Sequence, residues 1–239
     1  MTTTRHRRIA RITGIAYLGI VATGIFAEFA VRGSLVVADD PAATARNIAA
    51  SPGLFGVGIG ADVVMVALDV TVALGLFALL RHVDRRLALT ATVLRLVQDA
   101  VIAVGLIGLL PVVGLATDAV APDGTVLPGP ALDALDAVER HALVYDAGLI
   151  AFGLSCLVLG HLLRTEQLVP RLLAIGLSAT GAVYLAGSLA ALATPGLSAA
   201  IDPFYIVAIV VEPAFAVLLI TRGLRTTALT PIRPVPAAV

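Results

Sequence analysis

Six stretches of this chain are each long and apolar enough to cross a lipid bilayer, and this feature limits the possible folds more than any other. The hydrocarbon core of a bilayer is about 30 Å thick and an α-helix rises about 1.5 Å per residue, so roughly 20 apolar residues form one span. The sequence therefore predicts an all-α fold, a polytopic integral membrane bundle of six transmembrane helices. The expected spans are residues 12–31, 54–80, 87–110, 142–163, 172–193 and 204–220.

The composition supports a membrane protein and excludes several other classes. Hydrophobic residues make up 59% of the chain and charged residues only 13%, whereas about a quarter of the residues in soluble domains are charged. A formal net charge of zero and scattered arginines argue against nucleic-acid binding. The single cysteine, Cys156, excludes an internal disulfide and a cysteine-based metal cluster within one chain. We expect no cofactor and no metal centre, and the lipid bilayer is the one partner that the composition predicts.

The loops carry signals of their own. Asp40 followed by Pro41 predicts a short helix that reaches about Ala50 and lies outside the bilayer. The segment from 111 to 130 is rich in proline, glycine and aspartate, which predicts irregular chain, and an amphipathic turn after Pro130 is expected to lie at the membrane interface. Short interfacial helices are thus expected in the first and third loops. The proline-containing tail, 226–239, is expected to be disordered and cytoplasmic.

The arginines predict the orientation. If the N-terminus faces the cytoplasm, the inner segments hold twelve arginines, whereas the outer segments hold only Arg32, Arg46 and Arg140. Cytoplasmic loops of membrane proteins carry an excess of basic residues. Both termini are therefore predicted to be cytoplasmic. The absence of lysine and the abundance of alanine, valine and leucine indicate a bacterial genome of high GC content, so the expected location is the plasma membrane of a bacterium.

Ionisable and polar groups inside the spans fall into two layers. An outer polar layer is expected from Glu28, Asp62, His141 and Asp146. An Asp or Arg at the centre of a span costs roughly 2.5 to 3.5 kcal/mol on insertion scales, so central groups should point inward and converge. These midplane residues are Asp69, Arg95, Gln98, Asp99 and Glu212.

The midplane acids cannot all be ionised and still have their charge neutralised by the one midplane arginine. Arg95 and Asp99 are four residues apart, which predicts an ion pair along one helix, and Asp69 competes for the same guanidinium. Three acids beside one arginine predict that at least one of Asp69, Asp99 and Glu212 is protonated at neutral pH, unless a bound cation compensates. Pro213 is expected to kink the last span beside Glu212, either for packing or to free a carbonyl for a proton, water or cation.

Catalytic patterns are weak, and no catalytic residue is predicted. A zinc site formed by His141, Asp62, Asp146 and Glu28 is conceivable but lacks the usual histidine ligands. Cys156 and His161 are five residues apart on one span, which is a poor spacing for a nucleophile and its base. Glycines and other small residues in the fifth span, and Gly56, Gly58 and Gly60 in the second, predict close helix packing.

Several short motifs occur in order along the six spans: Arg8–Leu18, Asn47-Ile48, Arg95–Val97, Phe152–Leu162, Val169–Leu172 and Gly181–Tyr184. Together they resemble the bacterial membrane family catalogued as domain of unknown function 4386. The resemblance covers residues 8 to 223, and it implies a six-helix integral membrane protein but no reaction. The chain departs from the family pattern at Gln98, where a glutamate is expected, which argues against any role that requires an acid there.

Two classes of function follow from these observations. The first is a small carrier or ligand-binding membrane protein in which Asp69, Arg95, Asp99 and Glu212 form a buried polar site, reached from outside past the outer layer. The second is an accessory, sensory or structural membrane protein whose buried charges only fix the helix register. An intramembrane enzyme is a third, less favoured hypothesis.

Overall fold

The computed structural model describes residues 3–193, 197 and 200–225, and the predicted tail, 226–239, lies outside these residues. The described chain is helical, with no strand beyond one isolated bridge. Six helical segments are long and apolar enough to cross a membrane, which confirms the six-helix fold class. The helices are α1 (Thr3–Ile25), η1 (Phe26–Arg32), α2 (Gly33–Leu35), α3 (Pro41–Ala50), α4 (Pro52–Leu80), α5 (Arg85–Leu109), α6 (Val112–Ala119), α7 (Pro128–Thr165), α8 (Arg171–Ala193), η2 (Asp202–Tyr205) and α10 (Ile206–Thr221).

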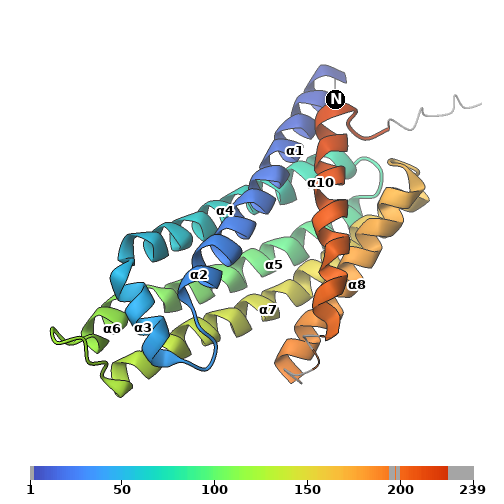
Figure 1. The fold of residues 1–239 in the computed structure, drawn as a ribbon. Coiled ribbons are helices and arrows are strands. Elements are labelled where there is room, and N and C mark those ends of the chain that lie inside the picture. The colour runs from blue at the N-terminus through green and yellow to red at the C-terminus, as the bar shows by residue number, and fades with distance from the viewer. Residues whose placement is uncertain (1–2, 194–196, 198–199, 226–239) are drawn as a thin grey trace, which may run out of the picture.

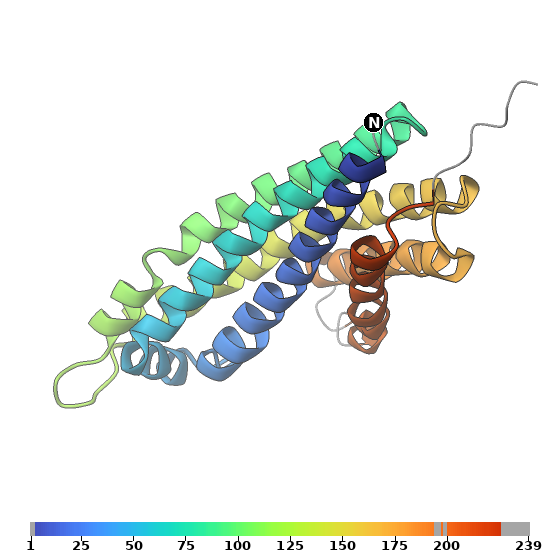
Figure 2. The same cartoon turned by 90° about the horizontal axis from the view of Figure 1, so that it is seen from above.

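The long helices form a closed ring. Going round it, α1 contacts α4, α4 contacts α5, α5 contacts α7, α7 contacts α8, α8 contacts α10, and α10 returns to α1. Figures 1 and 2 show α4, α5 and α7 running side by side, with α8 next to α7. A polar side chain that points into this ring is shielded from lipid on all sides by protein.

Local sequence signals account for the helix starts. Asp40 caps α3, since its carboxylate accepts a 2.8 Å hydrogen bond from the Ala43 N–H, and Pro41 takes the first helical position. Asp84 caps α5 in the same way, accepting from the N–H groups of Arg86 and Leu87 at 2.8 and 3.0 Å. These caps place α3 in the predicted first loop and set the start of the helix that carries Arg95.

The third loop differs from the prediction. Residues Val112–Ala119 form α6 rather than irregular chain, and residues after Pro130 belong to the same 38-residue helix as the fourth span. Packing explains the first difference, because Val112, Ala116 and Ala119 are fully buried where α6 lies against α3 and α7. At about 1.5 Å per residue, α7 is much longer than the roughly 30 Å hydrocarbon core, so it extends beyond the membrane as one helix.

The apolar core is split into two clusters along the bundle. One cluster includes Tyr17, Leu163 and Phe215, and the other includes Ile48 and Ile102. Along α4 and α5, Asp69, Arg95, Gln98 and Asp99 fall in the gap between these clusters: residue 69 lies between 65 and 72, and residues 95 to 99 lie between 88 and 102. The ring therefore encloses a polar layer between two apolar layers.

Candidate functional site

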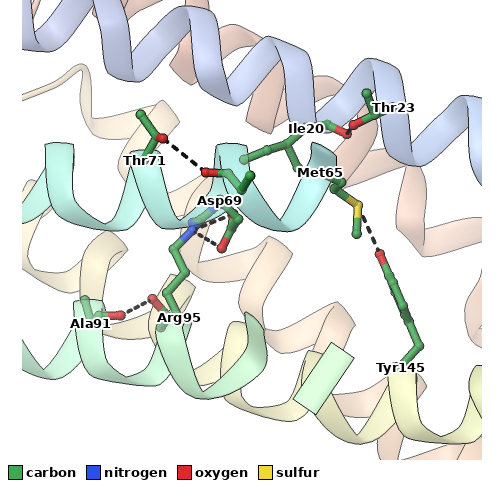
Figure 3. A network of polar contacts seen from close by, with 10 residues as sticks. Ile20, Thr23, Met65, Asp69, Thr71, Ala91, Arg95 and Tyr145 are labelled. Carbon is green, nitrogen blue, oxygen red and sulfur yellow. Dashed lines mark hydrogen bonds and ion pairs between the residues drawn. The ribbon is translucent and has the colours of Figure 1, made fainter. Parts of the chain in front are cut away.

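Arg95 of α5 and Asp69 of α4 form a fully enclosed ion pair, which we call the Arg95 centre together with Gln98, Asp99 and Glu212. The side chains of Arg95 and Asp69 are 2% and 3% exposed. The Arg95 Nε donates to both carboxylate oxygens of Asp69, at 2.8 and 2.9 Å, and Nη2 donates to Oδ1 at 2.5 Å. Figure 3 shows the two side chains pointing toward one another between neighbouring helices. The pair links α4 to α5 inside the ring.

Asp99 does not form the predicted ion pair with Arg95. It is 4% exposed, and neither of its carboxylate oxygens has a hydrogen-bond partner. An acid four residues after a base is the less favourable order on a helix, and Arg95 instead reaches across to α4. The Asp99 carboxyl lies near that of Asp69, so two acids are buried close to one guanidinium.

Two aromatic rings flank the Arg95 guanidinium. Its Cζ lies 5.0 Å from the ring centroid of Tyr17 in α1 and 4.8 Å from that of Phe152 in α7. Cation–π attraction at such distances stabilises a cation that has lost its water. The sequence did not indicate that these two rings meet Arg95, because a ring on another helix leaves no spacing signal around Arg95. Arg95 therefore contacts side chains from three other spans.

Glu212 and Gln98 complete this centre, and each has a side-chain oxygen without a hydrogen-bond partner. Glu212 of α10 is 6% exposed, its Oε1 has no hydrogen-bond partner, and it lies beside Tyr184 within range of the Arg95 and Asp69 charges. Gln98 is 7% exposed and its Oε1 is likewise unpartnered. Pro213 lies inside α10, which continues past it to Thr221. All five midplane residues are thus buried, and Asp99 and Glu212 lie near the pair formed by Arg95 and Asp69.

A second arginine, Arg32, bridges two acids, and we call these three residues the Arg32 centre. Its Nε donates to Glu28 Oε2 at 2.8 Å, and its Nη1 and Nη2 donate to the two carboxylate oxygens of Asp62 at 2.6 and 3.4 Å. Asp62 is 1% exposed, whereas the Glu28 side chain is 63% exposed. The arginine pattern predicted Arg32 only as a charge of an outer segment, although Glu28 four residues before it is the favourable order for an ion pair on a helix.

Glu28 and Arg32 lie on a π-helical segment, η1, that continues α1 without a break. π-helical turns are rare and are frequent at functional sites. The sequence showed no sign of this change of helix type. It shapes the end of the first span, where Arg32 reaches Asp62 of α4.

A cavity of about 630 Å³ opens beside the Arg32 centre. Its walls come from α1 and η1, from α7 and from η2. Of the predicted outer layer, Glu28, His141 and Asp146 line it, whereas Asp62 lies behind Arg32. Asp202 and Tyr205 also line it and were not predicted. We call this space the Arg32 cavity.

The Arg95 centre has almost no free space around it. The cavity that includes Arg95, Thr92 and Ser155 has a volume of about 10 Å³, which is about the space that one water molecule needs. Ser155 Oγ donates to the Ala91 carbonyl at 2.8 Å and closes this side. In the described part of the chain, no three His, Cys, Asp or Glu side chains are placed to hold a metal ion, including the outer acids and His141.

Comparison with known proteins gives a family but no activity. The profile of the family described as Domain of unknown function (DUF4386) matches residues 12–223. No curated protein matches the chain. No solved structure matches it either. A six-span helical bundle whose sequence matches the profile over nearly its whole length is a member of that family: the chain belongs to the DUF4386 family of membrane proteins of unknown function.

Proposed function

We propose that this protein is a small carrier of the bacterial plasma membrane, with both termini in the cytoplasm. Its ligand would enter through the Arg32 cavity, and the Arg95 centre would respond by changing its protonation and pairing. The observation that carries this proposal is the excess of acids at the Arg95 centre: Asp69, Asp99 and Glu212 are buried beside a single arginine.

A purely structural ion pair needs one acid, and Asp69 supplies it. Asp99 and Glu212 add two more buried carboxyl groups with unpartnered oxygens. An unsatisfied buried polar group costs about 1 to 3 kcal/mol, and more if it is charged. Ionisable groups kept inside membrane spans at such a cost mark proton and substrate pathways in transporters. We therefore assign Asp99 and Glu212 to proton exchange rather than to packing.

The two centres are physically connected. The ring of Tyr205, which lines the Arg32 cavity, lies 5.4 Å from that of Tyr184, and Tyr184 lies 5.0 Å from Phe152. Phe152 in turn lies against the Arg95 guanidinium. A ligand that displaces Tyr205 would therefore press on side chains that hold Arg95. Because the ring of helices is closed around Arg95, transport requires the ring to open.

The one cysteine of the chain provides the test. Cys156 is 1% exposed and lies near Arg95 and Glu212. If the ring opens, a membrane-impermeant methanethiosulfonate reagent should modify Cys156 in folded protein in membrane vesicles, faster than the protein unfolds. Asp69→Asn should change that rate, because it removes the partner of Arg95. Modification only at the rate of global unfolding would refute the carrier.

Further cysteine variants measure the background labelling and test the orientation of the protein in the membrane. Cys156→Ala should remove all labelling. On that background, Thr117→Cys and Thr165→Cys place a cysteine at two exposed positions at opposite ends of the bundle. The proposed topology expects Thr117→Cys to react from the periplasmic side and Thr165→Cys from the cytoplasmic side. The reverse pattern would overturn the orientation without affecting the carrier hypothesis.

A structural role is the second candidate, and one observation favours it. Arg95 is enclosed by Tyr17, Phe152 and Asp69, with only about 10 Å³ of free space. Buried ion pairs can fix the register of packed helices without any transport. This role expects an unreactive Cys156, so the same experiment separates the two candidates.

A further inference from the structure

We propose that the Arg32 cavity binds an organic cation, an ammonium group carried on an apolar body. This proposal deepens the carrier hypothesis by naming the chemical class of its ligand, and it rests on that hypothesis only for the use of the cavity. The volume of about 630 Å³ lies within the range of small-molecule sites.

The charges around the cavity favour a cation. Four acids line it, together with a single arginine. That arginine is already engaged by Glu28 and by Asp62 behind the wall. Within the described residues no ion pair involves Asp146, and the charged groups that act on it are two further acids, Glu28 and Asp202. Asp146 is half-buried, so an ammonium group beside it would be held in reduced contact with water.

Neutral side chains of the wall add to the recognition of a cation. His141 lines the cavity and is only 3% exposed, but its unpartnered Nδ1 lies against Gly105 of α5 and does not face the cavity. Tyr145 and Tyr205 also line the cavity, and aromatic rings attract cations through their faces.

The rest of the wall is apolar, which argues against a bare metal ion. Val36, Leu135, Val138 and Leu149 form much of the lining. In the described chain no three His, Cys, Asp or Glu side chains converge closely enough to coordinate a metal. A ligand with one positive charge and an apolar body would complement both parts of this surface.

Three probes that share one apolar body separate charge from hydrophobicity. The probes are phenethylamine, 2-phenylethanol and 3-phenylpropionate, which are cationic, neutral and anionic at neutral pH. Calorimetric titration of the detergent-purified protein should show phenethylamine binding at least about tenfold more tightly than the other two, a difference of about 1.4 kcal/mol. Equal binding of the alcohol and the amine would overturn the proposal.

Substitutions locate the site. Asp146→Asn should weaken phenethylamine binding about tenfold, and Tyr205→Leu should weaken it by a smaller factor. Asp118→Asn removes the same charge from an exposed position on α6, outside the cavity lining, and should leave binding unchanged. An Asp146→Asn variant that binds normally would overturn the proposal, and Tyr205→Leu keeps it testable if Asp146→Asn fails to fold.

The ammonium group could belong to a soluble amine or to a lipid headgroup. Nanodiscs of phosphatidylethanolamine and of phosphatidylglycerol distinguish these sources. If the lipid is the occupant, phosphatidylethanolamine should compete with phenethylamine and phosphatidylglycerol should not; if a soluble amine is the ligand, neither lipid should compete. This binding test does not require the ring to open, so it can fail while Cys156 labelling succeeds, and the reverse.

Discussion

The two arginine centres are built on the same face of one helix, yet they differ in their surroundings. Asp62 and Asp69 are seven residues apart on α4, about two helical turns, and each pairs with an arginine from another part of the chain. At the Arg95 centre, aromatic rings close over the ion pair and about 10 Å³ remains free. At the Arg32 centre, the ion pair borders a cavity of about 630 Å³.

The same Arg–Asp ion pair therefore has different properties at the two centres. In a sealed ion pair, each charge depends on the other for its stabilisation, because neither water nor lipid can solvate the charge that is left when one residue is removed. A pair at the edge of a cavity can be solvated when its geometry changes. The Arg95–Asp69 pair should therefore be sensitive to single substitutions, and the Arg32 centre should tolerate them while altering what the cavity binds.

Arg95→Ala should have the largest effect of any single substitution at these centres. Removing one partner of a buried ion pair costs about 3 to 5 kcal/mol, because the other charge is left uncompensated. Steric-trap unfolding in bicelles measures this loss. Arg164→Ala, an exposed arginine, is the control and should change stability little. The double variant Arg95→Met with Asp69→Leu should recover most of the loss, and a loss unchanged by the second substitution would contradict this account.

Gly153→Ala should cause the next largest loss of stability. It tests the packing that holds Phe152 over Arg95. A Cβ at position 153 would lie 2.8 Å from the carbonyl oxygen of Gly181, where α7 meets α8. Overpacking of this kind typically costs about 1 to 3 kcal/mol. Gly24→Ala is the matched control at the Arg32 cavity, since its Cβ would meet only the flexible Met65 side chain at 3.3 Å. Equal losses for the two variants would remove the distinction between a sealed and an open region.

Arg32→Ala should destabilise the fold less than Arg95→Ala, by about 1 to 2 kcal/mol, between the ranges for surface and buried pairs. The Arg32 side chain is 12% exposed and faces the cavity, so water can reach the Asp62 carboxylate that is left behind. The same unfolding assay measures the difference. A loss as large as that of Arg95→Ala would show that the two centres are equally dry.

Asp99→Asn should have the smallest effect and should be close to neutral or stabilising. Its carboxylate oxygens have no hydrogen-bond partner, so the substitution removes a buried acid without breaking a pair. Asp69→Asn, which breaks the pair, serves as the comparison and should be clearly destabilising. Infrared spectra should also lose a protonated-carboxyl band in Asp99→Asn or in Glu212→Gln. No such band in the wild-type protein at neutral pH, in the absence of a bound cation, would contradict the prediction that one buried acid is protonated.

The glycines were predicted to mark close helix packing, and this prediction was right at some positions and wrong at others. Small residues in the fifth span predicted close packing, and Gly176 and Gly181 of α8 do lie against neighbouring helices. The same reasoning was wrong for Gly56 and Gly60 of α4, where a Cβ would meet nothing within 4 Å, although Gly58 does lie against Val31. Sequence alone cannot tell which face of an apolar helix meets protein and which meets lipid, since both are apolar.

The sequence by itself determined the six helices, because lipid imposes a length and an apolar character that can be read residue by residue. It also identified the buried charges, because each stands out in a span from which charges are otherwise missing. Only the tertiary structure decided the partners: Arg95 with Asp69 rather than Asp99, the rings of Tyr17 and Phe152, and Arg32 with Asp62. These contacts join different helices, and their pairing depends on the ring order and rotation of the helices, which hydropathy does not encode.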